Sequence, residues 1–221
     1  EIGNPNLKRA VIENYDLRFE YFPDYGEVIA LSGFFKRFTD AIEDSLAAEA
    51  TRPILTWSNA PLAENWGFEV ELRKKLDFAT LTEDLTISAN YTRVWSEVEV
   101  KDRSGNDVTR PLQGQAPWSI NAGLLYDNPN SGTAVNLLYN TVGRRLYQVS
   151  DAEFLNIYIE PYDKLDLVVT QKISRVFKVK AAAKNILAED VIKTSGTLEN
   201  PYEYSRISTG SEYSLSLSGR F

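Results

Sequence analysis

Acidic side chains are the groups in this sequence whose types and spacing come nearest to catalytic chemistry. Glu69 and Glu71 alternate along one stretch, and Asp166 lies in another. Two carboxylates that flank a sugar can hydrolyse a glycosidic bond. Nothing in the sequence brings two of these groups to one substrate, and Arg18 and Arg73 offer them ionic partners. We therefore predict paired charges on a wetted surface, with no catalytic residue and no enzyme activity.

The residue types that are missing exclude most other chemistry. The chain has no cysteine, histidine or methionine, so it cannot build a disulfide, a thiolate or imidazole metal site, or a Ser-His-Asp relay. Asp102, Ser104 and Asn106 are spaced like the first ligands of a calcium loop, but Gln113 stands where the closing glutamate would be. We expect a hairpin tip there, and no metal or cofactor.

Aromatic and arginine side chains in the long polar segments are the candidates for binding a ligand. Aromatic rings stack on sugars or peptides, and arginine pairs with anionic groups such as phosphates. The candidates are Trp57, Arg144, Arg145, Tyr158 and Tyr202. The same aromatics can instead pack the loops together or join an interfacial girdle, the role that we favour for Trp66 and Trp118, and the arginines can be solvated.

Composition narrows the class of protein. The net charge of −7 argues against nucleic acid as the main partner, because phosphate contacts need clustered lysine and arginine. No run of about 18 apolar residues is present, so the sequence predicts no transmembrane helix. A mean hydropathy of −0.31 is compatible with a membrane barrel, in which only alternate residues face lipid.

Period-two alternation defines the elements that must position these groups. In the stretch from Trp66 to Leu72, apolar residues alternate with glycine and glutamate. Nine such strands of about ten residues are predicted, a length suited to a tilted crossing of a bilayer. They cover residues 14–22, 28–38, 66–76, 85–95, 118–126, 133–140, 164–173, 177–185 and 212–221.

The connections between these strands alternate strictly between short and long. The long connections run over residues 40–64, which are predicted to be irregular, and over residues 97–115, 143–162 and 186–211. In an up-and-down antiparallel sheet every second connection lies at the same end, so all long segments share one end, as in outer-membrane barrels. The fold prediction is an all-β, antiparallel, up-and-down transmembrane β-barrel segment. A soluble sandwich produces the same alternation and remains the alternative.

Several stretches, in order, resemble the C-terminal barrel of TonB-dependent outer-membrane receptors of the type common in Bacteroidetes-like bacteria. They include "GNPNLKRAVIENYDLRFEYF", "FFKRFTDAIE", "WGFEVELRKKLDF", "RPLQGQAPWSINAGLLYDNP" and "KLDLVVTQKI". The resemblance implies that residues 1–221 are the last part of a 22-strand barrel, without its plug domain and N-terminal strands. It also implies an outer-membrane location and contacts with lipid, with the missing plug and barrel, and, through that plug, with TonB.

The activity that this resemblance implies is energised uptake of a large nutrient, such as a glycan, a peptide or a metal chelate. Two alternatives stay open: a non-transporting outer-membrane adhesin or scaffold, and a soluble carbohydrate-binding β-sandwich.

The final stretch, "EYSLSLSGRF", resembles the signal read by the barrel assembly machinery, which favours a terminal aromatic residue. Its residues are Tyr213, Leu215, Leu217 and Phe221, although Gly219 departs from the pattern. We expect this strand to close the barrel at its C-terminal edge. Because the chain begins with Glu1 rather than methionine, we also expect it to be a processed product or a piece of a longer protein.

Overall fold

Strands make up the regular secondary structure of the computed structural model, which describes residues 2–48, 53–76, 84–101, 105–150, 156–196 and 200–219. They are β1 (Val11–Tyr21), β2 (Val28–Ala48), β3 (Pro53–Lys75), β4 (Leu85–Lys101), β5 (Asp107–Arg110), β6 (Trp118–Asn128), β7 (Thr133–Val142), β8 (Arg145–Ser150), β9 (Ile157–Ile159), β10 (Asp163–Lys172), β11 (Phe177–Lys184), β12 (Val191–Gly196), β13 (Pro201–Ile207) and β14 (Glu212–Gly219). No helix in these ranges is long and apolar enough to cross a membrane.

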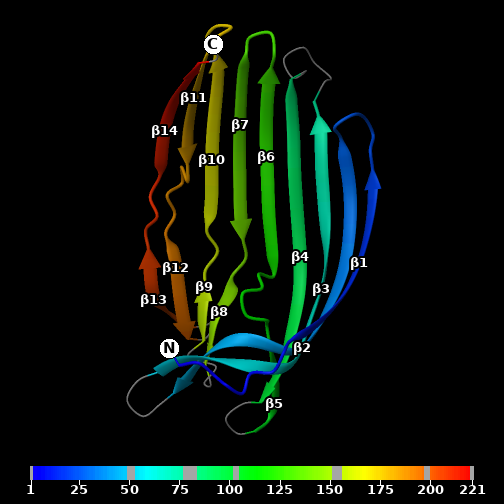
Figure 1. Ribbon diagram of the computed structural model, residues 1–221, viewed down its shortest axis with the longest axis vertical. Coiled ribbons are helices and arrows are strands. Elements are labelled where there is room, and N and C mark those ends of the chain that lie inside the picture. The colour runs from blue at the N-terminus through cyan, green and yellow to red at the C-terminus, as the bar shows by residue number, and fades with distance from the viewer. Residues whose placement is uncertain are drawn as a thin grey trace.

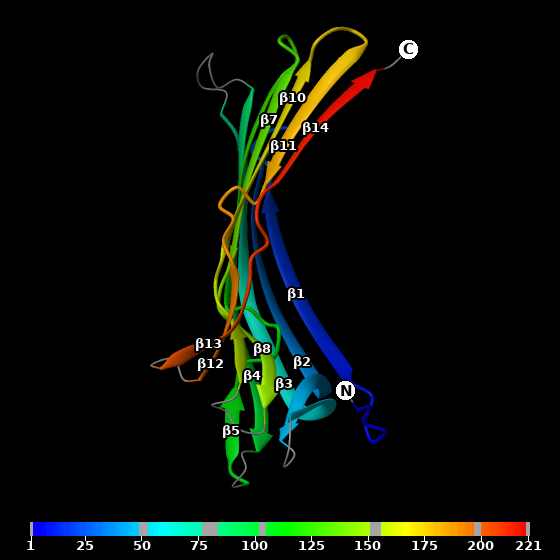
Figure 2. The same cartoon turned by 90° about the vertical axis from the view of Figure 1, so that its left-hand side faces the viewer.

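Nine long strands form one antiparallel meander, which confirms the predicted strand set. In spatial order they are β1, β2, β3, β4, β6, β7, β10, β11 and β14 (Figure 1). The sheet is curved and open, with β1 and β14 at its edges (Figure 2). Among the described residues β1 pairs only with β2, and β14 only with β11. The fourteen strands of the described residues all belong to one sheet, whereas a sandwich needs two packed sheets, so the sandwich alternative is wrong.

The two faces of the sheet differ in polarity, as the alternation predicts. The apolar face carries Leu17, Phe19 and Leu215, which are strongly exposed. The polar face carries a side-chain ladder across four neighbouring strands. Asn90 donates to Glu69, Asn121 Nδ2 donates to Asn90 Oδ1 at 3.4 Å, and Asn140 Nδ2 donates to Asn121 Oδ1 at 2.7 Å. This division is explained if the apolar face contacts lipid and the polar face contacts water.

Connections are sorted by length between the two ends of the sheet. The β6–β7 and β10–β11 turns lie at the end where β14 finishes, and the long connections lie at the opposite end (Figure 1). The prediction that residues 40–64 are irregular is wrong for the described residues 40–48 and 53–64, which belong to β2 and β3. β2 and β3 stay paired in register from Val28↔Arg73 out to Ala48↔Pro53, and β5, β8, β9, β12 and β13 lie in the other long segments. Hydrogen bonds between backbone N–H and C=O groups form strands here although the side chains do not alternate, so the side-chain pattern did not indicate them.

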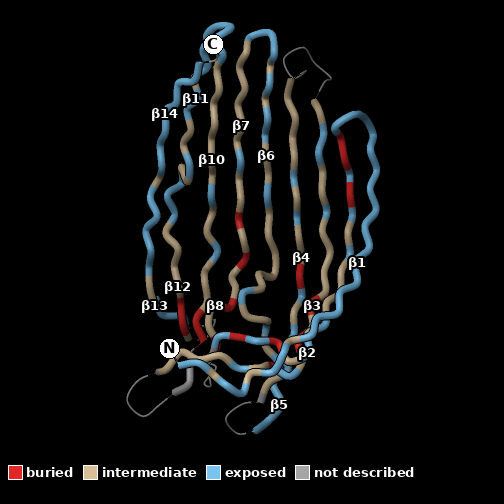
Figure 3. The backbone as a smooth tube through the Cα atoms, viewed as in Figure 1, coloured by how far each residue is buried: buried red, intermediate tan, exposed pale blue. Residues whose placement is uncertain are grey.

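Buried residues gather mainly at the long-connection end (Figure 3). A small apolar cluster there contains Ala41, Ala60, Ala63 and Val98, with Leu112 packed against it. This packing links three segments that are distant in the sequence, and it fixes the geometry of the surface described next.

Candidate ligand-binding surface

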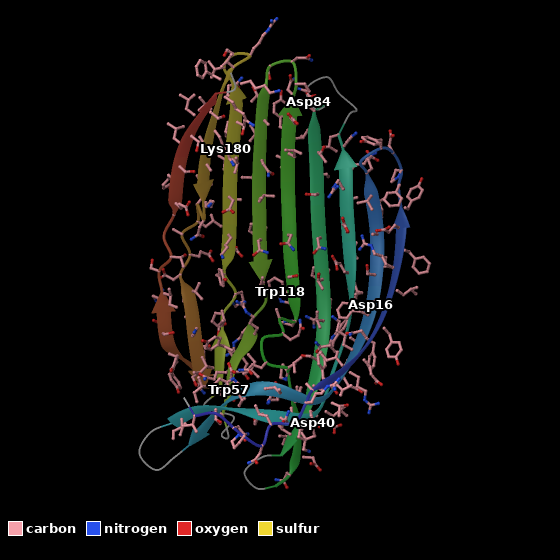
Figure 4. All side chains as sticks on the ribbon, in the orientation of Figure 1. Asp16, Asp40, Trp57, Asp84, Trp118 and Lys180 are labelled. Atoms are coloured by element: carbon pink, nitrogen blue, oxygen red, sulfur yellow. The ribbon has the colours of Figure 1, made fainter. Side chains whose placement is uncertain are left out.

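The outer part of the β2–β3 hairpin turns across the end of the sheet instead of continuing along it (Figures 1 and 2). We call this part, residues 39–48 and 53–62, the overhang. Its corner is Asp40, with φ of 53°, a left-handed conformation that aspartate tolerates better than most residues. Asn59 Nδ2 donates to Asp40 O at 2.8 Å and so braces the corner from the partner strand. Figure 4 labels Asp40 near the corner and Trp57 farther along the overhang.

A buried ion pair holds the overhang against the end of β5. Arg110 Nη1 and Nη2 bind the two carboxylate oxygens of Glu43 at 3.1 and 2.5 Å. The Glu43 side chain is 4% exposed and that of Arg110 is 15% exposed. Gln113 N also donates to Glu43, at 3.1 Å. Paired geometry and an added backbone donor offset the cost of burying these charges.

Gln113 extends this contact to β8. Its Oε1 accepts a hydrogen bond from Asp44 N at 2.8 Å, and its Nε2 donates to Tyr147 O at 2.8 Å. The overhang backbone also pairs in parallel with β8, through Ser45↔Val149 and Leu46↔Ser150. One continuous surface therefore joins β2, the segment after β5, and β8.

Two of the candidate ligand-binding residues, Arg144 and Tyr158, contact each other. The Arg144 guanidinium carbon lies 3.8 Å from the centroid of the Tyr158 ring. Arg144 Nε donates to Glu160 Oε1 at 2.8 Å, and Nη2 donates to Thr194 Oγ1 at 3.3 Å. Thr194 in turn donates to Glu160. This cluster fixes the ring of Tyr158 and joins the segment before β8 to β9 and β12.

Arg145 has a different environment, in which one guanidinium nitrogen has no hydrogen-bond acceptor among the described residues. Its guanidinium lies 6.0 Å from the centroid of Tyr162, and Lys164 Nζ lies 5.3 Å from the same ring. Its Nη1 is buried and makes no hydrogen bond within the described residues. An unsatisfied cationic donor of this kind favours an anionic group nearby.

Trp57 and Tyr202 lie apart from the other three candidates. Trp57 is in the overhang, where its carbonyl accepts a hydrogen bond from Asn4 Nδ2 at 2.8 Å. Tyr202 is on β13, and it is 52% exposed. Within the described ranges neither ring makes a ring contact or cation–π contact with Arg144, Arg145 or Tyr158. The structure thus joins two of the five candidates directly and spreads the others over the same end of the sheet.

Sequence reasoning missed the residues that organise this surface: Glu43, Arg110, Glu160, Lys193 and Thr194. Lys193 Nζ lies 3.5 Å from the Tyr147 ring centroid. Glu43 and Arg110 are 67 positions apart. No local spacing could have indicated that pair, because the bend of the overhang brings its members together.

The carboxylates weighed as a catalytic pair are engaged by other groups. Glu71 accepts a hydrogen bond from Arg18 Nη2 at 2.7 Å, and Asp166 accepts one from Asn185 N at 2.8 Å. Glu71 and Asp166 line one groove of about 500 Å³ on the polar face, beside Arg73 and Lys164. Of the incomplete calcium pattern, Asp102 and Ser104 lie outside the described residues.

β13 carries an arginine that binds two carboxylates. Arg206 Nη2 lies 2.7 Å from Glu203 and its Nη1 lies 3.0 Å from Asp190. These hydrogen bonds lower the pKa of Glu203 and of Asp190 below their usual values. The folded state therefore binds fewer protons than the unfolded chain, so the contribution to stability is present at neutral pH and is lost as pH falls through the lowered pKa values.

We expect the β12–β13 hairpin to loosen in acid below about pH 4, the ordinary carboxyl range. Amide protection factors of β13, measured by hydrogen exchange at pH 7 and pH 3, test this. Arg206→Gln is the control and should have low protection at both values. An equal loss of protection in acid with and without Arg206 would contradict the assignment.

The residues of the expected assembly signal lie at the free edge of the sheet. Tyr213, Leu215 and Leu217 point to the apolar face of β14, and Leu215 is 78% exposed. Phe221 lies outside the described residues. The three described side chains thus lie on the expected face.

A family model described as "TonB dependent receptor-like, beta-barrel" matches residues 1–186. No curated protein sequence matches the chain.

Solved structures share its fold. The ferric enterobactin receptor PfeA of Pseudomonas aeruginosa, as its G324V mutant, is 19% identical with a TM-score of 0.60, over 98% of this chain and 32% of that one. The iron transporter FrpB of Neisseria meningitidis is 15% identical with a TM-score of 0.63, over 98% and 31%. The copper transporter OprC is 16% identical with a TM-score of 0.67, over 98% and 33%. The chain therefore spans about a third of the length of these proteins.

Proposed function

The chain belongs to the TonB-dependent receptor β-barrel family of the outer membrane, and on this premise we propose that it forms wall and loops of a receptor for energised nutrient uptake. The apolar face of the sheet meets lipid, and the polar face meets the barrel interior. The relatives of known structure are receptors and transporters rather than enzymes. We propose that this chain likewise contributes no chemical catalysis.

This proposal rests mainly on one observation: additional paired strands, with partly buried side chains, lie together at one end of the sheet. The overhang, β5, β8, β9, β12 and β13 all lie at the end with the long connections. A plain wall needs only strands long enough to cross the bilayer. Strands extended beyond that length and locked by Glu43 and Arg110 suit a shaped extracellular surface that holds a ligand.

The remaining parts of the receptor belong to the same proposal. Residues 1–221 are proposed as the C-terminal portion of the barrel, with the plug and N-terminal strands supplied by the rest of the protein. In the part of the chain that the structure describes, β1 and β14 each have one unpaired edge, which supports this proposal, since exposed strand edges invite pairing. TonB acts through the plug. The barrel assembly machinery reads the β14 residues Tyr213, Leu215 and Leu217 together with Phe221.

The ligand is a glycan, a peptide or a metal chelate, and we propose that Trp57, Arg144, Arg145, Tyr158 and Tyr202 contact it. Tyr202 supports a direct role because its ring is exposed. Arg144 and Tyr158 present a preorganised pair, since their mutual contact and Glu160 already hold them. The buried Nη1 of Arg145 supports contact with an anionic part of the ligand.

Uptake by cells that express the full-length receptor tests this function. Three probes, ferric enterobactin, a maltodextrin and a mixed tripeptide pool, represent the three ligand classes. We expect one of them to accumulate, and only in cells that also contain TonB. Accumulation that does not depend on TonB, or no accumulation of any class, would contradict the proposal and would favour an adhesin or scaffold.

For the accumulated probe, Tyr202→Ala is expected to weaken binding about tenfold through loss of ring stacking. Tyr15→Ala is the matched control, because Tyr15 is 64% exposed but lies on the lipid-facing side of β1. Titration of the purified receptor measures both affinities. If the Tyr202→Ala and Tyr15→Ala receptors bind the probe with equal affinity, Tyr202 does not contact the ligand.

A further inference from the structure

Arg93 lies on the lipid-facing side of β4. It is paired in register with Phe68 of β3 and with Trp118 of β6. Its guanidinium lies 5.0 Å from the centroid of the Trp95 ring, and its Nη1 donates to Pro117 O at 3.3 Å. Figure 4 shows Trp118 at the long-connection end of β6. The arginine is therefore surrounded by aromatic residues on a surface that faces the membrane.

The height of Arg93 on the strand places it at the outer edge of the lipid-facing band. From the short-turn end of β4, the lipid-facing positions are Leu85, Ile87, Ala89 and Tyr91, and then Arg93. The eight steps along the strand from Leu85 to Arg93 rise about 20 Å at the usual strand tilt, within an apolar band about 25 Å tall. A guanidinium there extends to the lipid headgroups.

Arg93 also differs from the nearest cation on the same face. Arg37 lies two rows farther out, and its Nε is 3.7 Å from Glu64 Oε1. Among the described residues no carboxylate forms an ion pair with Arg93, whose contacts are the Pro117 carbonyl and the Trp95 ring. Four of its five N–H groups thus remain for another acceptor. A cation in this position is costly unless an anion compensates it.

We propose that Arg93, framed by Trp95 and Trp118, binds the phosphate of a lipid headgroup in the outer leaflet. The guanidinium matches the two-oxygen edge of a phosphate, and the indole rings match the junction of headgroup and acyl chain. The lipid-facing wall of β3, β4 and β6 continues below the site and contacts the acyl chains. This site is separate from the extracellular ligand surface, and it does not depend on whether the receptor transports anything.

Native mass spectrometry of the full-length receptor, titrated with a short-chain phosphatidic acid, tests the proposal. Diacylglycerol with the same chains is the matched probe, since it lacks only the phosphate. We expect phosphatidic acid to be retained at least about tenfold more strongly than diacylglycerol, and Arg93→Gln to abolish that difference. Arg93→Lys should restore part of it, because a point charge remains.

Arg37→Gln is the control variant and should bind as the native protein does, since Arg37 already has Glu64 as its partner. Heat-modifiable migration on a gel confirms that each variant is folded. Equal retention of the two lipids, or unchanged preference in Arg93→Gln, would overturn the proposal. Full competition by inorganic phosphate would also overturn it, because the site would then take the free anion.

Discussion

Replacing Arg110 by methionine is expected to destabilise the overhang by about 3–5 kcal/mol, the usual cost of leaving one member of a buried ion pair without its partner. The Glu43 carboxylate is almost completely buried and would keep only the Gln113 N–H as a donor. Because Gln113 connects the overhang to β8, loss of the Glu43–Arg110 ion pair should also loosen Tyr147 and the residues next to it. We expect ligand binding to weaken together with this local order.

Hydrogen exchange of residues 39–48 and 53–62 measures the free energy of local opening. The double variant Glu43→Gln with Arg110→Met should recover much of the loss, since it leaves no buried charge. The exposed pair of Lys8 and Asp40, 3.7 Å apart with the Lys8 side chain 73% exposed, provides the control. Lys8→Ala should cost less than about 1 kcal/mol. If Arg110→Met costs no more than Lys8→Ala, the ion pair does not hold the overhang.

Replacing Gly67 by alanine is expected to destabilise the sheet by about 3 kcal/mol, the upper end of the usual cost of overpacking. A Cβ at this position would lie 2.2 Å from Arg93 O and 2.7 Å from Phe34 Cζ. The Phe34 ring can move, but the Arg93 carbonyl belongs to the backbone of the next strand. Relief of the clash therefore requires β3 and β4 to separate.

Gly33→Ala is the matched control, on the strand that neighbours β3. The nearest atom to its Cβ would be Gly67 O at 4.0 Å, which is an ordinary contact. Urea unfolding of the receptor refolded into lipid vesicles compares the two variants. Equal stability of both, close to that of the native protein, would show that β3 and β4 do not approach at Gly67 as described.

Local sequence was sufficient for the nine strands, their two faces and the sorting of connections by length. Strand alternation has a period of two residues, so Trp66, Phe68 and Val70 reveal their face without reference to any other segment. The sequence also indicated that the acidic residues of the polar face form ion pairs, and Glu71 does pair with Arg18. The family resemblance rested on the order of these stretches, and the family match over residues 1–186 confirms it.

The structure of the long connections was harder to predict, because it does not depend on an alternation of apolar and polar side chains. Residues 40–64 were expected to be irregular, yet they continue the β2–β3 hairpin, since backbone hydrogen bonds form between residues of almost any type. The overhang additionally needs the left-handed conformation of Asp40, which aspartate permits but does not require.

Tertiary structure alone decided which distant groups meet. Glu43 contacts Arg110, and Arg144 contacts Tyr158 and Thr194, across strands that only the completed sheet places side by side. The sequence established an all-β wall with one oily face, because that pattern is repeated in every strand. The shape of the surface above that wall follows from a few contacts between distant segments, and those contacts leave no periodic signal.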